Sequence, residues 1–155
     1  MLHCGLHAVN AILQSLRHAP ACMTCTEMDA ITRRVHQREQ ELCPDGRDTE
    51  PQDCGNYPLE TLIVALRLHN LSTEFEKPLA IIRNHFIVPR NVVGFLLGTG
   101  DHYVSIVRGS TEERWRLIDN GRLVDTDARS PFSLIARMAV PPRVVLRVIS
   151  RRRPL

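Results

Sequence analysis

Apolar residues recur at helical spacing in the first half of the chain. Over residues 4–16 an apolar side chain returns every third or fourth position, which is typical of a helix with one buried face. A second helix is predicted from about residue 26 to residue 42, where the same spacing runs among charged residues. Thr26 and Asp29 have the spacing of a capping box at its start. Residues 59–71 form the third predicted helix.

Beyond residue 71 the pattern becomes strand-like. Short apolar runs predict strands at residues 72–76, 92–97, 102–108, 114–119 and 143–150. Residues 131–138 predict a helix, and residues 80–85 fit either a helix or a loop. The strands at 102–108 and 114–119 should pair as a hairpin, because a Gly-Ser turn lies between them. Helices first and antiparallel strands later predict an α+β fold, with a mostly antiparallel sheet packed on helices.

The composition is that of one ordinary globular domain. The chain has 155 residues, of which 43% are hydrophobic and 24% charged. A domain of this size buries roughly two-thirds of its unfolded surface. No apolar run approaches the ~20 residues that span a bilayer, and no signal-peptide pattern opens the chain. We therefore expect a single intracellular domain over residues 1–150, in the cytoplasm or additionally in the nucleus, without membrane contact.

The charge distribution argues against nucleic acid as a partner. The chain has 20 basic and 17 acidic residues, a net charge of +3, and only 5% aromatic residues. Nucleic-acid-binding domains usually gather basic residues on one face and add stacking aromatics. Here the basic cluster lies in the tail, residues 151–155, which we interpret as a solvated end.

The number of cysteines favours a reducing compartment. The chain has five, Cys4, Cys22, Cys25, Cys43 and Cys54, and an odd number without a signal peptide does not suggest a disulfide framework. Cys22 and Cys25 form a single Cys-x-x-Cys pair. A closed zinc site would need two more ligands, and the remaining candidates stand at irregular spacings: Cys43, Cys54 and His36. We therefore expect the cysteines to be free thiols rather than zinc ligands, and we expect no metal or cofactor.

The sharpest candidate for chemistry combines three residues that are distant in sequence. Cys4 opens the first helix, His102 opens one strand of the predicted hairpin and Asp119 closes the other. Because the start of one antiparallel strand lies beside the end of its partner, the carboxylate should orient the imidazole toward a nucleophile. A thiol at a helix N-terminus faces backbone N–H groups that stabilise a thiolate and suit an oxyanion. Gly5 should leave room for a substrate backbone. The order Cys, His, Asp is that of papain-like acyl transfer.

Three neighbouring polar residues have secondary interpretations. His7 shares a helix face with Cys4, but its angle is poor for removing the thiol proton, so we interpret it as structural. Asn120 is the reserve candidate for the third site residue. Asn10 is expected to be a buried amide that ties the helix to a loop.

The first motif resembles that of a known family. The stretch LHCGLHAVNAILQ at residues 2–14 closely resembles the catalytic helix of Josephin domains, found in the ataxin-3 and Josephin deubiquitinases. Shorter stretches are similar to further family segments in the same order, at residues 55–59, 93–95, 101–104 and 115–120. The resemblance extends from residue 2 to about residue 150.

The resemblance implies a papain-like cysteine protease, a deubiquitinase that hydrolyses the isopeptide or peptide bond after the C-terminus of ubiquitin. Cys4 would be the nucleophile, His102 the general base and acid, and Asp119 the orienting residue. Ubiquitin or polyubiquitin would be the partner. Residues 26–54 would form a projecting helical arm that gates access of ubiquitin.

One departure and three alternatives accompany this interpretation. Family members carry an oxyanion-binding Gln a few residues before the nucleophile, and none of the three residues before Cys4 is Gln. Loss of one such donor lowers the rate about a hundred- to a thousand-fold.

The alternatives are a cysteine protease that processes a polyprotein or another ubiquitin-like modifier, a catalytically weak ubiquitin-binding module, and a zinc-dependent interaction domain.

Overall fold

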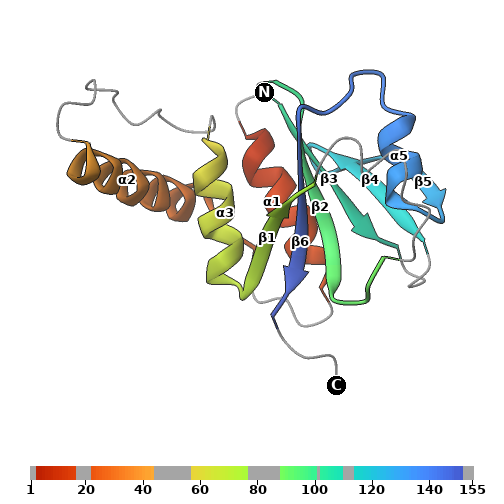
Figure 1. Ribbon diagram of the computed structural model, residues 1–155, viewed down its shortest axis with the longest axis horizontal. Coiled ribbons are helices and arrows are strands. Elements are labelled where there is room, and N and C mark those ends of the chain that lie inside the picture. The colour runs from red at the N-terminus through yellow and green to blue at the C-terminus, as the bar shows by residue number, and fades with distance from the viewer. Residues whose placement is uncertain are drawn as a thin grey trace.

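The computed structural model describes residues 3–16, 22–43, 57–76, 88–100, 102–109 and 114–151. Its helices are α1 (Cys4–Ser15), α2 (Cys25–Leu42), α3 (Leu59–Leu68) and α5 (Pro131–Ala136). Its strands are β1 (Leu71–Phe75), β2 (Val92–Gly98), β3 (Tyr103–Arg108), β4 (Trp115–Asp119), β5 (Arg122–Ala128) and β6 (Val144–Ser150). The strands form one antiparallel sheet in the order β1-β6-β2-β3-β4-β5, so the fold is α+β (Figure 1).

Apolar side chains are buried on both faces of the sheet. On one face α1 and α3 pack over side chains that include Leu96 and Val107. On the other face α5 packs over Phe95, whose ring meets the Trp115 ring edge-on at a centroid distance of 5.7 Å. Successive side chains of a strand point to opposite faces, so neighbouring residues of β2 serve the two layers. The sheet is therefore the middle layer of three.

The capping box of α2 lies two residues before the predicted position. Thr24 is the N-cap residue: its side chain accepts a hydrogen bond from the Glu27 backbone N–H, and the Glu27 carboxylate accepts one from the Thr24 backbone N–H. The prediction of Thr26 and Asp29 was wrong because both threonines have an acidic residue three positions later. The longer Glu side chain reaches the cap backbone, and Asp29 instead accepts a hydrogen bond from Tyr57.

Helix α3 ends three residues earlier than predicted. Its last residue is Leu68, and Asn70 adopts a left-handed conformation with φ 61°. Asn tolerates this conformation, which typically follows the end of a helix. Leu71, expected in the helix, is the buried first residue of β1. The other predicted strands are confirmed with small shifts of their ends, whereas residues 80–85 lie outside the described ranges.

Strand β5 was not predicted, although the sequence contains a signal for it. Asn120 and Gly121 both have positive φ, 50° and 76°, and connect β4 to β5. An Asn-Gly pair of this conformation is the commonest two-residue hairpin turn. The exposed first residues of β5, among them Leu123 and Val124, give it no clear alternation of buried and exposed positions.

Helix α2 projects from the rest of the molecule (Figure 1). Its buried residues, Met28, Ile31 and Thr32, all lie in its first half, where Thr32 Oγ1 is 3.1 Å from Oγ1 of Thr61 on α3. Residues 37–43 are exposed. Of the predicted arm, residues 26–54, the described part is thus a helix anchored at one end. No helix in the described ranges has both the length and the apolar character needed to cross a bilayer.

Candidate functional site

The hairpin of β3 and β4 brings His102 and Asp119 together. Asp119 is the last residue of β4 and His102 immediately precedes β3. The Nε2 atom of His102 lies 2.7 Å from Oδ1 of Asp119. The backbone of His102 is held against Thr99, because its carbonyl accepts a hydrogen bond from the Thr99 backbone N–H at 2.8 Å. The two side chains are 22% and 37% exposed, so the pair is accessible to solvent.

The contact through Nε2 determines what the imidazole can do. A neutral imidazole that donates from Nε2 to a carboxylate has Nδ1 as its acceptor nitrogen. Nδ1 is then the atom that can take a proton from a nucleophile. The carboxylate also stabilises the imidazolium that such a transfer produces. The pair therefore has the chemistry of a general base with its orienting residue.

The turn after β4 determines which residue reaches the imidazole. Asp119 is still paired in the sheet, opposite Arg122 of β5. Asn120 has turned away into the left-handed conformation. The acceptor on His102 is accordingly Asp119, and Asn120, the reserve candidate, serves the turn.

Cys4 lies at the same end of the sheet as this pair. It is the first residue of α1 and only 4% exposed. His7, one helical turn further on, has its Nδ1 atom 3.9 Å from the position that a Cβ on Gly121 would occupy, which places the start of α1 beside the Asp119 turn. In the described part of the chain no side chain caps α1.

Tyr103 and Glu60 extend the surroundings of Cys4. The pKa of Tyr103 is raised above its ordinary value by burial, and further by negative charge on Cys4 and on Glu60. Tyr103 follows His102 directly, and Glu60 lies in the first turn of α3. Cys4 and Glu60 therefore each act on Tyr103, and the start of α1 packs against α3, where a Cβ on Gly5 would lie 2.9 Å from Cδ2 of Leu62. Sequence patterns did not single out Glu60, because only the packing of α3 beside α1 brings it here.

Gly5 does not have the predicted role. A Cβ at this position would lie 2.9 Å from Cδ2 of Leu62 and 3.7 Å from Cβ of Tyr57. Gly5 is buried against α3. The absence of a side chain allows the two helices to approach closely, and the prediction that it leaves room for substrate was wrong.

Asn10 ties α1 to the segment before α2, as predicted, although the amide is partly buried rather than buried. Its side-chain amide donates to the carbonyl of Met23 at 2.9 Å and accepts from the Met23 backbone N–H at 2.8 Å. His7, by contrast, is exposed beside the turn that contains Gly121. Among the described residues, His7 forms no hydrogen bond with His102 or Asp119.

The other described cysteines have separate surroundings. Cys22 Sγ accepts from Nε2 of Gln14 at 3.3 Å, whereas Cys25 Sγ lies 3.6 Å from Nδ1 of His3. Cys43 is exposed and follows the far end of α2, about 27 Å from Cys25 at 1.5 Å per helical residue. Cys54 lies outside the described ranges. Within those ranges no three His, Cys, Asp or Glu side chains are grouped as a metal site would require.

Comparison of the chain with models of known protein families and with curated proteins gave no match. The geometry of the site therefore has to carry the functional interpretation together with the motif resemblance.

Proposed function

We propose that the chain is a cysteine-dependent deubiquitinase of the Josephin type with a papain-like fold. Cys4 is the nucleophile, His102 the general base and acid, and Asp119 the orienting residue. The observation that carries the proposal is the 2.7 Å contact between His102 Nε2 and Asp119 Oδ1 at the end of the sheet where α1 begins with Cys4.

In the proposed reaction His102 Nδ1 takes the proton of the Cys4 thiol. The thiolate attacks the carbonyl carbon of the last ubiquitin residue, and the first-turn N–H groups of α1 donate to the oxyanion. His102 then gives its proton to the departing amine, which leaves a thioester on Cys4. Water, deprotonated by the same imidazole, hydrolyses the thioester and restores the thiol. Because the nucleophile is a thiolate, the proposal includes a reducing compartment, the cytoplasm or also the nucleus.

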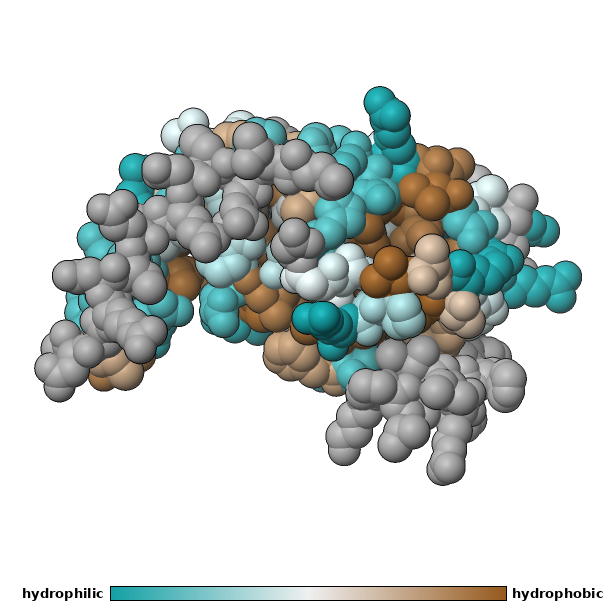
Figure 2. Space-filling model, turned by 90° about the horizontal axis from the view of Figure 1, so that it is seen from above, coloured by the Kyte–Doolittle hydropathy of each residue, from teal (hydrophilic) through white to brown (hydrophobic). Residues whose placement is uncertain are grey.

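The surface beside the site supports a protein as the substrate. Figure 2 shows the end of the molecule at which α1 begins, and apolar side chains gather there on the side away from α2. Leu123 and Val124, just beyond the Asp119 turn, are 55% and 59% exposed. Grouped exposed apolar side chains are typical of surfaces that bind other proteins.

The projection of α2 from the molecule supports its interpretation as an arm that gates access of ubiquitin. Helix α2 is anchored on α3 through Thr32 and Thr61, and α3 packs against the start of α1, where a Cβ on Gly5 would lie 2.9 Å from Cδ2 of Leu62. A change in the angle of α2 would therefore alter the approach to the thiol. In the proposal, α2 and the residues that follow it to residue 54 control the access of ubiquitin or polyubiquitin.

The test is labelling with a ubiquitin whose C-terminus carries a thiol-reactive electrophile, followed by intact-mass spectrometry. We expect one adduct on the wild type and none on Cys4→Ala. Cys25→Ala is the matched control, because it removes a neighbouring thiol that contacts a different imidazole, and it should label like the wild type.

Three other outcomes would contradict the proposal. An adduct that persists in Cys4→Ala would exclude Cys4 as the nucleophile. Labelling only by an electrophile built on another ubiquitin-like modifier would indicate the alternative protease. Saturable ubiquitin binding without any adduct would indicate a binding module.

A further inference from the structure

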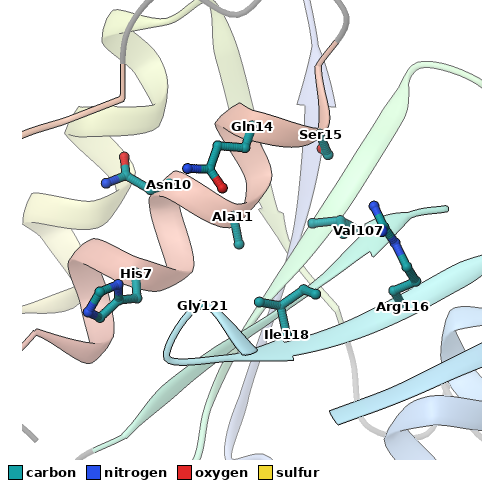
Figure 3. Close-up of a pocket in the computed structure, with 9 residues that line it drawn as sticks. All are labelled: His7, Asn10, Ala11, Gln14, Ser15, Val107, Arg116, Ile118 and Gly121. Atoms are coloured by element: carbon teal, nitrogen blue, oxygen red, sulfur yellow. The ribbon is translucent and has the colours of Figure 1, made fainter. Parts of the chain in front are cut away.

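A pocket separate from the thiol and imidazole lies between α1 and β4. Its volume is about 510 Å³, within the range of roughly 300–1,000 Å³ typical of small-molecule sites. Figure 3 shows side chains of α1 along one side and of β3 and β4 along the other. The lining includes Ala11, Gln14, Val107, Arg116 and Ile118.

Arg116 is the charged group of this pocket, and its hydrogen bonds are incomplete. Its Nε atom is buried and has no hydrogen-bond partner among the described residues. Its Nη2 atom donates to the carbonyl of Arg108, at 3.5 Å. A buried N–H group without a partner is destabilising, and such groups are rare in folded proteins.

Other arginines of the described chain have partners that Arg116 lacks. Arg137 pairs with Asp125 at 3.0 Å, and Arg147 pairs with Glu76. The Arg108 guanidinium lies 4.4 Å from the centre of the Trp115 ring. Within the described ranges no carboxylate forms an ion pair with Arg116. Among the described residues the positive charge of Arg116 is therefore uncompensated, and an external anion would compensate it.

The rest of the lining restricts what that anion is. Ala11 and Ile118 offer apolar surface, whereas Gln14 and Ser15 add an amide and a hydroxyl. One guanidinium compensates one negative charge and matches the planar geometry of a carboxylate. A phosphate dianion would keep an uncompensated charge, and it would gain nothing from the apolar surface.

We propose that the pocket between α1 and β4 binds a small carboxylate with an apolar body, held by Arg116. The carboxylate accepts hydrogen bonds from the guanidinium, and the apolar body packs against Ala11 and Ile118. This binding does not depend on the proposed hydrolysis, since Cys4, His102 and Asp119 do not line the pocket.

The test uses benzoate as the probe, with benzamide as its neutral counterpart, and follows backbone amide signals by NMR. Benzoate should shift the signals of the pocket residues saturably, in the millimolar range expected of so small a ligand. Benzamide at equal concentration should leave them unchanged. Arg116→Gln should weaken benzoate binding at least tenfold, whereas Arg67→Gln, which removes the same charge from an exposed position on α3, should not.

Wild-type mapping keeps the proposal testable even if Arg116→Gln does not fold. The proposal would be overturned if benzoate shifted no backbone amide signals, or shifted only those of residues away from α1 and β4. Saturation by inorganic phosphate but not by benzoate would overturn the choice of a carboxylate. Equal binding of benzoate and benzamide would exclude Arg116 as the recognition group.

Discussion

The imidazole of His102 depends on one carboxylate for its orientation. We expect Asp119→Ala to lower kcat/KM for a ubiquitin C-terminal substrate about 10²- to 10⁴-fold, because the ring loses both its orientation and its charge partner. Asp119→Asn keeps an oxygen that can accept from Nε2, so its rate should lie between those of Asp119→Ala and the wild type. Steady-state kinetics with a fluorogenic ubiquitin substrate would measure all three.

The control for this comparison is Asp125→Ala. Asp125 lies on the neighbouring strand and pairs with Arg137, so its removal should leave the rate unchanged. A wild-type rate for Asp119→Ala would mean that the contact with His102 has no part in the reaction.

Several residues of the candidate site could be predicted, because each follows a local rule. Cys4 opens a periodic apolar stripe, and His102 and Asp119 occupy matching ends of two paired strands. No such rule predicts that Glu60 lies near Tyr103 or that Arg116 lines a pocket. Both arise where separate elements pack, and spacing along one chain segment contains no information about that packing.

At the scale of single elements, the start of α2 offers a direct test of capping. Thr24→Ala should lower the free energy of unfolding by about 1 kcal/mol, because the Glu27 N–H loses its partner. Thr26→Ala, one residue inside the helix and also exposed, should change it by only a few tenths. Urea denaturation of both variants measures the difference. Equal effects would contradict the observed cap and favour the box at Thr26.

The contact between Tyr57 and α2 makes a prediction about alkaline pH. Burial raises the pKa of Tyr57 well above its ordinary value, and the hydrogen bond to Asp29 raises it further. The pKa of Tyr103 is also raised, and Tyr57 and Tyr103 are the two tyrosines of the chain. Near pH 10 the folded protein should therefore show little phenolate absorbance, whereas the protein unfolded in urea should titrate at about pH 10.

The raised pKa of Tyr57 makes the free energy of unfolding depend on pH. A phenol whose pKa is higher in the folded state stabilises the protein fully below its unfolded pKa of about 10 and loses this contribution as pH rises further. Tyr57→Phe should reduce the alkaline fall in unfolding free energy. An unchanged fall would mean that Tyr57 ionises as easily in the folded protein as in the unfolded chain.

Element types were easier to predict than element ends. The 3.6-residue period is strong over α1 and α2, so both were predicted, but the cap of α2 depended on which of two threonines an acidic side chain could reach. Strand β5 was missed because its exposed Leu123 and Val124 break the alternation that identifies a strand. In that segment the Asn-Gly turn was the better signal.

At the scale of the whole molecule, the two apolar layers share one sheet. Leu62 is fully buried on the α3 side, while Trp115, the single tryptophan, is buried on the α5 side. Leu62→Ala should lower the unfolding free energy by about 2–5 kcal/mol. The change should appear in Trp115 fluorescence, because the layers unfold together.

Leu68→Ala is the matched control on the same helix. Leu68 is 63% exposed, so its truncation should shift the fluorescence transition only slightly. If Leu62→Ala left the Trp115 fluorescence transition unchanged while circular dichroism reported loss of helix, the two faces of the sheet would unfold separately.

In the described part of the chain, the residues of α2 that pack against the core extend no further than Val35, so the helix acts as a lever. Its 18 residues extend about 27 Å at 1.5 Å per residue. A tilt of about 10° at the contact between Thr32 and Thr61 would carry the tip at Leu42, about 15 Å away at 1.5 Å per residue, through about 3 Å. Small adjustments of packing beside α3 are thereby amplified at the remote end.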